Sequence, residues 1–218
     1  MGSISERTAY HHGNLREALI AASLDLLECE GCAGLGLRAA ARAAGVSQTA
    51  PYHHFGGKEG LLAAVAAHGF RLMRAEQDRI ALGARETGLD PEAVVHALGA
   101  GYVRMARRQP ELFRLMFGTA IADRDAHPEL VEAYRDGYSV IADATRELLI
   151  WRNGAVDPED VAVAVTAAWA TVHGLANLLI DGRLRAGEND VPEEDVLVRR
   201  VLETFSLSVG RHVRSGTS

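Results

Sequence analysis

The chain has 218 residues, of which 48% are hydrophobic, enough to form one large core or two modest ones. The first residues are polar and no uninterrupted apolar run reaches membrane-spanning length, so we expect a cytoplasmic protein rather than a secreted or membrane protein. The formal net charge of −6 argues, when taken alone, against a nucleic-acid partner.

The charge is unevenly distributed along the chain. The segment between Glu30 and Glu59 has no acidic residue but contains Arg38, Arg42 and Lys58, so it carries +3 and the remainder carries −9. A local basic surface on an acidic protein is typical of a small DNA-binding site, although a short acid-free segment also arises by chance. Lys58 is the only lysine, a preference for arginine that suggests a GC-rich bacterial genome.

Helical periodicity runs from Asn14 to the end of the chain without a strand candidate, so we predict an all-α fold of about nine helices. Asn14 and Glu17 have the capping-box spacing, which predicts a first helix that begins there and stops at Gly31. Two short helices are predicted over 37–44 and 48–55, and a long helix over 58–82.

Prolines mark the starts of the later helices. At three of them the proline occupies the first helical position, and an acid lies beside it near the positive end of the helix dipole. These helices begin at Pro91, Pro128 and Pro158, and Pro110 and Pro192 begin the remaining two.

Residues 37–58 have the pattern of a helix-turn-helix. Gly45 can adopt the left-handed conformation that ends the first helix, Val46 can pack between the helices, and Ser47 can cap the second helix and donate to a phosphate. The second helix then presents small and polar side chains, of which Gln48 can pair with an adenine edge. An ordinary αα corner has the same spacing, so the pattern alone leaves both interpretations open.

The residues around this motif resemble the TetR/AcrR family of bacterial transcriptional regulators. Residues 10–65 carry the resemblance most strongly, above all the segments 35–47 and 51–62. Farther along the chain, Trp169, His173 and Gly174 resemble the subgroup with a WHG-type C-terminal domain.

The resemblance implies a homodimer that binds a palindromic double-stranded DNA operator and regulates transcription. Repression is the usual mode, with release when a small-molecule effector binds the C-terminal domain. It implies no enzyme activity, no cofactor and no metal. The expected organisation is an arm over 1–13, a helix-turn-helix domain over 14–60, a connecting helix over 61–82, and an effector-binding and dimerisation domain over 83–214.

Carried over position by position, the resemblance implies phosphate contacts from Tyr52 and Lys58. One position departs from the family pattern, because Gly36 stands where a serine or threonine usually caps the helix and touches a phosphate. The predicted DNA-binding residues are Arg38, Ser47, Gln48, Thr49, Tyr52, His53 and Lys58.

Two further sets of residues are predicted in the C-terminal part. Apolar stripes on the last two long helices fit the family's dimer interface, with an intramolecular core as the alternative; they comprise Val165, Ala168, Val172, Val198, Leu202, Phe205 and Val209. Aromatic and methionine side chains fit an effector pocket, although at helical spacing they also suit a core; they are Tyr102, Met105, Phe113, Met116, Phe117, Tyr134, Tyr138, Trp169 and His173.

Other functions remain as alternatives at this stage. Cys29 and Cys32 form a single C-x-x-C, which lacks the four ligands of a structural zinc site but allows a redox trigger on the same DNA-binding fold. A helical protein-binding adaptor would share the fold without binding DNA. No recognised catalytic motif is present, which argues against an enzyme.

Overall fold

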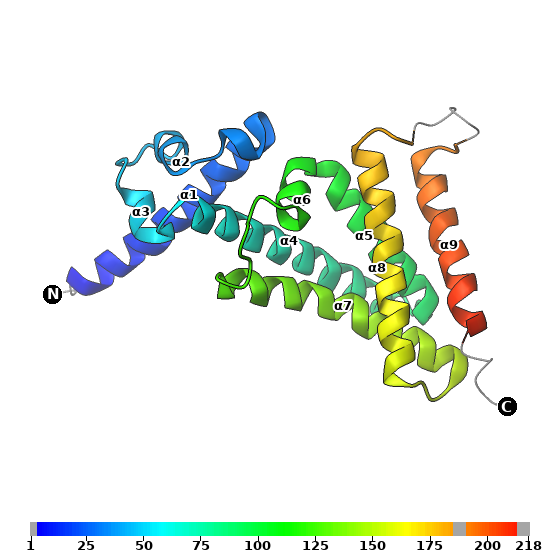
Figure 1. Ribbon diagram of the computed structural model, residues 1–218. Helices are drawn as coiled ribbons and strands as arrows, with labels where there is room; N and C mark the ends of the chain where they lie inside the picture. Colours follow the sequence, from blue (N-terminus) through cyan, green and yellow to red (C-terminus); the bar gives the residue numbers. More distant parts are fainter. Residues whose placement is uncertain (1–3, 185–190, 213–218) are drawn as a thin grey trace. The chain divides into compact units, whose positions relative to one another are not determined.

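The computed structural model describes residues 4–184 and 191–212, with side chains described for 15–184 and 191–206. Within these residues there are nine helices and no strand, which confirms the predicted all-α fold (Figure 1). The helices are α1 (Ile4–Gly34), α2 (Leu37–Ala43), α3 (Ala50–Phe55), α4 (Lys58–Glu86), α5 (Pro91–Arg108), α6 (Pro110–Phe117), α7 (Pro128–Asn153), α8 (Pro158–Ile180) and α9 (Glu194–His212).

The first helix differs from the prediction at its start. It begins at Ile4, so Asn14 lies inside the helix and the predicted capping box is wrong. The physical reason is that extending a helix costs far less than nucleating one, and residues 4–13 contain no proline to stop it. The predicted break is confirmed, because Gly31 has the non-helical angles φ 67° and ψ −176°.

Contact clustering divides the chain into two compact units. Unit 1 contains the residues up to Arg71 together with Gln109–Tyr134, and unit 2 contains Leu72–Arg108 and the residues from Arg135 onward. The helices α4 and α7 therefore each begin in unit 1 and end in unit 2, and α6 belongs to the same unit as α1 to α3.

The core of unit 1 is built around Phe70 of α4, which is fully buried. The rings of Phe117 and Tyr134 meet it edge-on, at centroid distances of 5.2 and 5.5 Å. Gly69 allows α6 to come close, because a Cβ atom there would lie 2.6 Å from the sulfur of Met116. Burial of a phenylalanine of this kind contributes about 2–3 kcal/mol, so this cluster holds α4, α6 and the start of α7 to the rest of the unit.

The core of unit 2 is formed by α5 against α8 and α9, with α7 beside it. One cluster joins α5 to α7 through Val95, Leu98, Ala144 and Leu148. On the other side of α5, Gly99 permits close packing, since a Cβ atom there would lie 2.6 Å from Leu202.

Helix α8 is long and apolar enough to cross a membrane by length and composition, with a mean hydropathy of 1.6 over its most apolar window. Thr166, Thr171 and His173 interrupt its apolar residues, so it is not an uninterrupted apolar run. Its apolar character has a partial explanation in packing, because 39% of that window is buried against the rest of the chain.

Candidate nucleic-acid interface

The turn between α2 and α3 is fixed by backbone hydrogen bonds. Gly45 has φ 67°, the N–H of Val46 donates to the carbonyl of Ala41 at 3.0 Å, and the N–H of Gly45 donates to that of Arg42 at 3.1 Å. This is a Schellman motif, in which the left-handed residue is almost always glycine because a side chain would be strained. The predicted role of Gly45 in ending the helix is thus confirmed.

Helix α3 starts later than predicted and without a side-chain cap. Thr49 occupies the N-cap position, and its side chain makes no capping hydrogen bond. Ser47 lies in the preceding turn, where its carbonyl accepts from the N–H of Ala50 and its hydroxyl lies 3.3 Å from that of Thr49. The prediction that Ser47 caps this helix is therefore wrong, and its hydroxyl remains exposed together with that of Thr49.

Two side chains fix α3 from its inner side. Pro51 is buried, and Phe55, the last residue of the helix, is half-buried. The guanidinium carbon of Arg16, on α1, lies 5.7 Å from the centroid of the Phe55 ring, which is the geometry of a cation–π contact. His54 is half-buried at the same helix end.

The predicted DNA-binding side chains differ from these packed residues in being exposed to solvent. Those of Arg38, Ser47, Gln48, Thr49, Tyr52, His53 and Lys58 are all exposed. Tyr52 is 46% exposed although it is a large aromatic residue. Arg42, at the end of α2, is exposed as well. The inward-facing residues of α2, by contrast, are the apolar Leu37, Ala40 and Ala41.

Because Gly36 replaces the serine or threonine of the family pattern, α2 has no side-chain N-cap. Gly36 is the N-cap residue with an extended backbone, and no side chain caps the helix there. Its carbonyl still accepts from the N–H of Ala40 at 2.9 Å. The helix therefore forms without the hydroxyl that the family pattern supplies.

One residue of this region was missed by sequence reasoning. The carboxylate of Glu59, next to Lys58, accepts from the backbone N–H groups of Ala122 and Asp123 at 2.8 and 3.0 Å. It thus fixes the loop after α6 to the start of α4, and its negative charge is used to accept these two hydrogen bonds. An acid in the first turn of a helix was the only available signal, and it does not reveal a partner more than sixty residues away.

Comparisons with known proteins agree with this geometry. Residues 19–65 match the bacterial regulatory proteins of the tetR family, and residues 95–205 match the tetracyclin repressor-like C-terminal domain. The chain belongs to the TetR family of bacterial transcriptional regulators. Members of this family are DNA-binding regulators rather than enzymes, as the sequence predicted.

Solved structures show the same fold. A protein of unknown function from Rhodococcus sp. RHA1 is 33% identical, with a TM-score of 0.73, and the match covers 94% of this regulator and 97% of that chain. PfmR from Thermus thermophilus, a TetR family regulator, is 17% identical with a TM-score of 0.60 over 87% and 97%. FadR from Bacillus subtilis, solved in complex with stearoyl-CoA, is 14% identical with a TM-score of 0.66 over 87% and 97%. No curated protein matches the sequence.

The residues predicted for the effector pocket lie in both units. In unit 1, Phe113 and Met116 are fully buried, and Phe117 and Tyr134 contact Phe70. In unit 2, the hydroxyl of Tyr102 lies 2.8 Å from Nδ1 of His173, and the Trp169 ring lies 5.6 Å from that of His173. Burial lowers the pKa of His173 below its ordinary value, so the imidazole is kept neutral. Met105 and Tyr138 are half-buried in unit 2.

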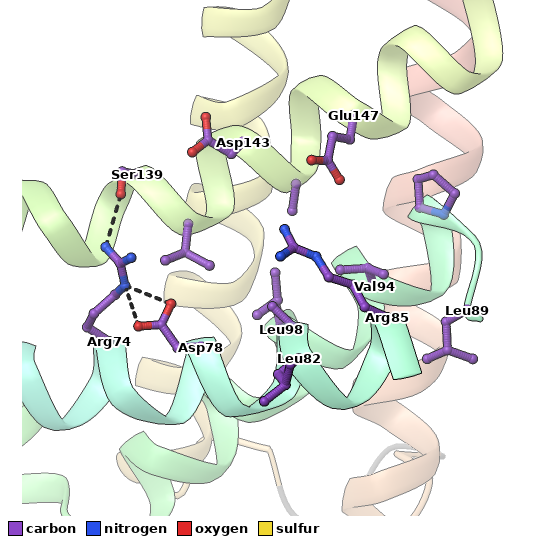
Figure 2. Close-up of a pocket in the computed structure, with 14 residues that line it drawn as sticks. Arg74, Asp78, Leu82, Arg85, Leu89, Val94, Leu98, Ser139, Asp143 and Glu147 are labelled. Carbon is purple, nitrogen blue, oxygen red and sulfur yellow. Dashed lines mark hydrogen bonds and ion pairs between the residues drawn. The ribbon is translucent and has the colours of Figure 1, made fainter. Parts of the chain in front are cut away.

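A groove of about 540 Å³ lies in unit 2 between α4, α5 and α7 (Figure 2). Its floor is apolar and includes Leu98 and Ala144, both buried. Figure 2 shows Arg85 of α4 pointing across the groove toward Glu147 of α7. Neither forms an ion pair within the described residues, whereas Arg74, at one end, is fixed by Asp78 and Ser139. None of the residues predicted for the effector pocket lines this groove.

The predicted dimer residues are buried inside the subunit. Val165, Ala168, Val172, Val198, Leu202 and Phe205 are each at most 7% exposed, so they belong to the intramolecular core of unit 2. The side chain of Val209 lies outside the described residues. A different stripe, at helical spacing, faces outward from α8. It consists of Val163, Ala167, Ala170, Gly174 and Leu178, all exposed and none of them polar.

Both cysteines are free thiols in the structure. Cys29 is exposed and Cys32 is partly buried. Burial and the nearby carboxylate of Glu111 raise the pKa of Cys32, and the smaller opposing effect of Lys58 does not reverse this. A thiol with a raised pKa is mostly protonated at neutral pH and is therefore a poor nucleophile.

Proposed function

We propose that this TetR family protein is a homodimeric repressor that binds a palindromic operator and leaves it when a small-molecule effector binds unit 2. The observation that carries the DNA-binding part is the arrangement of α2 and α3. Every predicted contact is exposed on one motif whose inner side is packed and whose turn is fixed by backbone hydrogen bonds.

The proposed roles of the contacts follow from their chemistry. Tyr52 and Lys58 bind phosphate oxygens, and Lys58 does so at the start of α4, where the helix dipole also favours an anion. Gln48 and Thr49 contact bases or backbone from the turn before α3, His53 does so from within α3, and Arg38 reaches a base or a phosphate from α2. Ser47 donates its exposed hydroxyl to a phosphate.

Dimerisation is proposed through the outward stripe of α8. The residues from Val163 to Leu178 expose an apolar surface whose small members, Ala167, Ala170 and Gly174, permit close helix approach. Pairing of this stripe with its copy buries the apolar side of α8 that the subunit leaves open. A single short recognition helix supplies too few base contacts, so two copies are needed to occupy successive major grooves.

Two features of unit 2 support the effector proposal. The groove beside Arg85 has a volume within the range of small-molecule sites and an apolar floor. The Tyr102–His173 pair offers polar groups among aromatic side chains at the interface of α5 and α8. Since α4 lines the groove and also begins beside the DNA-binding motif at Lys58, it provides one continuous helix for coupling.

A mobility-shift assay with the DNA that flanks this gene tests the proposal. We expect a complex whose affinity falls steeply between two salt concentrations, as phosphate contacts require. An effector screen is then run on the same complex, with Ala81→Trp to obstruct the groove and His173→Gln to alter the buried pair. Operator affinity that never changes in the presence of a ligand known to bind would exclude the effector part.

A further inference from the structure

Glu129, in the first turn of α7, connects two other helices of unit 1. Its Oε2 accepts from Nη2 of Arg16 on α1 at 2.5 Å, and its Oε1 accepts from Nη2 of Arg71 on α4 at 2.6 Å. Each carboxylate oxygen is thus used by a different arginine. We call this three-residue arrangement the Glu129 bridge.

The bridge extends to the recognition helix through Arg16. The same guanidinium that binds Glu129 lies over the ring of Phe55, the last residue of α3. Arg16 also lies 3.7 Å from Glu17, its neighbour in the chain, but this contact is longer and the Glu17 side chain is 65% exposed. Glu129 is therefore the main anion that orients the guanidinium on the Phe55 ring.

The surroundings show that this orientation is not imposed by packing alone. A hollow of about 190 Å³ lies beside the contact, lined by Arg16, His54, Phe55 and Glu129 among others. Phe55 therefore has space into which it can move if Arg16 is released. Burial of Glu129 raises its pKa, but the hydrogen bonds and charges of Arg71 and Arg16 outweigh this and hold the pKa below its ordinary value.

We propose that Glu129 is a positioning residue for DNA binding: through Arg16 and Phe55 it holds the C-terminal end of α3 in the orientation that fits the major groove. The inference rests on the proposed function of α3 as the recognition helix. Because α7 continues from Glu129 into unit 2, where Asp143 and Glu147 line the groove, the bridge also provides a route by which α7 influences α3.

The test compares Glu129→Gln with wild-type protein for operator affinity and salt dependence. A purely electrostatic role and a positioning role for Glu129 predict opposite changes in operator affinity. If only charge matters, removing an acid from the DNA-binding unit raises the affinity. If the Glu129 bridge positions α3, its loss lowers the affinity, and we expect a decrease of about tenfold. Glu129 binds no phosphate, so the slope of log affinity against log salt should stay unchanged.

Glu132→Gln is the matched control, because Glu132 is an exposed glutamate less than one turn farther along α7 and makes no ion pair within the described residues. It should leave affinity unchanged or raise it slightly. Arg16→Lys keeps the charge but loses the stacked guanidinium, so it should reproduce the decrease. The contact with the Phe55 ring is made by Arg16 and not by Arg71, so the operator affinity of Arg71→Lys should stay within about twofold of wild type.

If Glu129→Gln binds the operator as well as wild type, or better, the proposal is overturned. If the variant is destabilised in urea, a double-mutant cycle with Phe55→Leu decides: coupled effects on operator affinity support the bridge, and additive effects overturn it. If wild-type protein does not bind the flanking DNA, that result excludes only this DNA as the operator. The variants are then compared on a binding site selected from random DNA.

Discussion

The N–H of Val46 donates to the carbonyl of Ala41 across the helix-turn-helix corner, at 3.0 Å. This bond requires the left-handed backbone of Gly45 between the two helices. The angle between α2 and α3 is consequently set by the main chain, and the exposed side chains of the corner are left for DNA.

Gly45→Ala should destabilise the protein by about 1 kcal/mol, because an L side chain is strained at φ 67°. Gly83→Ala is the matched control. Neither glycine has any atom within 4 Å of an added Cβ, so space does not distinguish them. Gly83 lies inside α4, where alanine is the better helix former, and the change should stabilise the protein by about 0.5–1 kcal/mol. Urea unfolding measures both, and an equal effect of the two changes would contradict the assignment.

The phosphate contacts are tested by salt dependence. Lys58→Ala should weaken operator binding and lower the slope of log affinity against log salt by about one, because one phosphate contact is lost. Tyr52→Phe should weaken binding roughly fivefold through loss of a hydroxyl donor. Arg199→Ala on α9, which removes an exposed cation far along the chain, should change neither quantity. Unchanged operator binding by both Lys58→Ala and Tyr52→Phe would contradict these two phosphate contacts, whereas wild-type protein without salt-sensitive DNA binding would favour a helical adaptor.

The outward stripe of α8 is tested at Gly174, where an added Cβ would have no other part of its own subunit within 4 Å. Gly174→Arg should therefore leave the monomer folded but introduce a charge into the close contact of two α8 helices, and sedimentation velocity should show monomers. Ala75→Arg adds the same charge at another exposed helical position and should remain dimeric. A dimer that tolerates Gly174→Arg would place the interface elsewhere.

The sequence predicted the helices and the DNA-binding motif well because both depend on local signals. Prolines at the starts of α5 to α8 and the Gly45 turn act within a few residues, and these were confirmed. The last helix begins at Glu194 rather than at the predicted Pro192. The side on which an apolar helix is buried is not a local property. In α8, both Val165 and Val163 are apolar, and only tertiary packing, for Val165 the cluster that it forms with Leu149 of α7, decides that Val165 is buried and Val163 exposed.

Long-range polar contacts were beyond sequence reasoning for a similar reason. Glu59 and Glu129 each read as an ordinary acid in the first turn of a helix. Their partners lie 58 to 113 residues away in the chain, and nothing in the local pattern indicates them. The grouping of α6 with the DNA-binding helices likewise follows from tertiary packing around Phe70 rather than from chain order.

The thiols provide a test of the redox alternative. Because the pKa of Cys32 is raised by burial and by Glu111, mild oxidants should leave operator affinity unchanged at neutral pH. The double variant with Cys29→Ser and Cys32→Ser should bind DNA as wild type does. An oxidant that abolishes binding by wild-type protein but not by the double variant would instead establish a redox trigger.

The buried histidine predicts a pH dependence of stability. Burial lowers the pKa of His173 in the folded protein, so the unfolded chain takes up a proton at a higher pH than the folded one. Folding stability therefore falls as the pH drops below the ordinary histidine value of about 6.5, and the loss stops once the pH is below the folded pKa. The free energy of unfolding, measured in urea from pH 7.5 to pH 5, should show this decrease.

His173→Gln isolates this contribution, because glutamine keeps a hydrogen-bonding partner for Tyr102 but does not titrate. The variant should lose part of the pH dependence between pH 7 and pH 5, even if its stability at pH 7.5 is lower. His53→Gln serves as the control, since that side chain is exposed on α3 and should leave the pH profile of stability unchanged. Equal profiles for wild type and His173→Gln would show that the imidazole is not kept neutral by its surroundings.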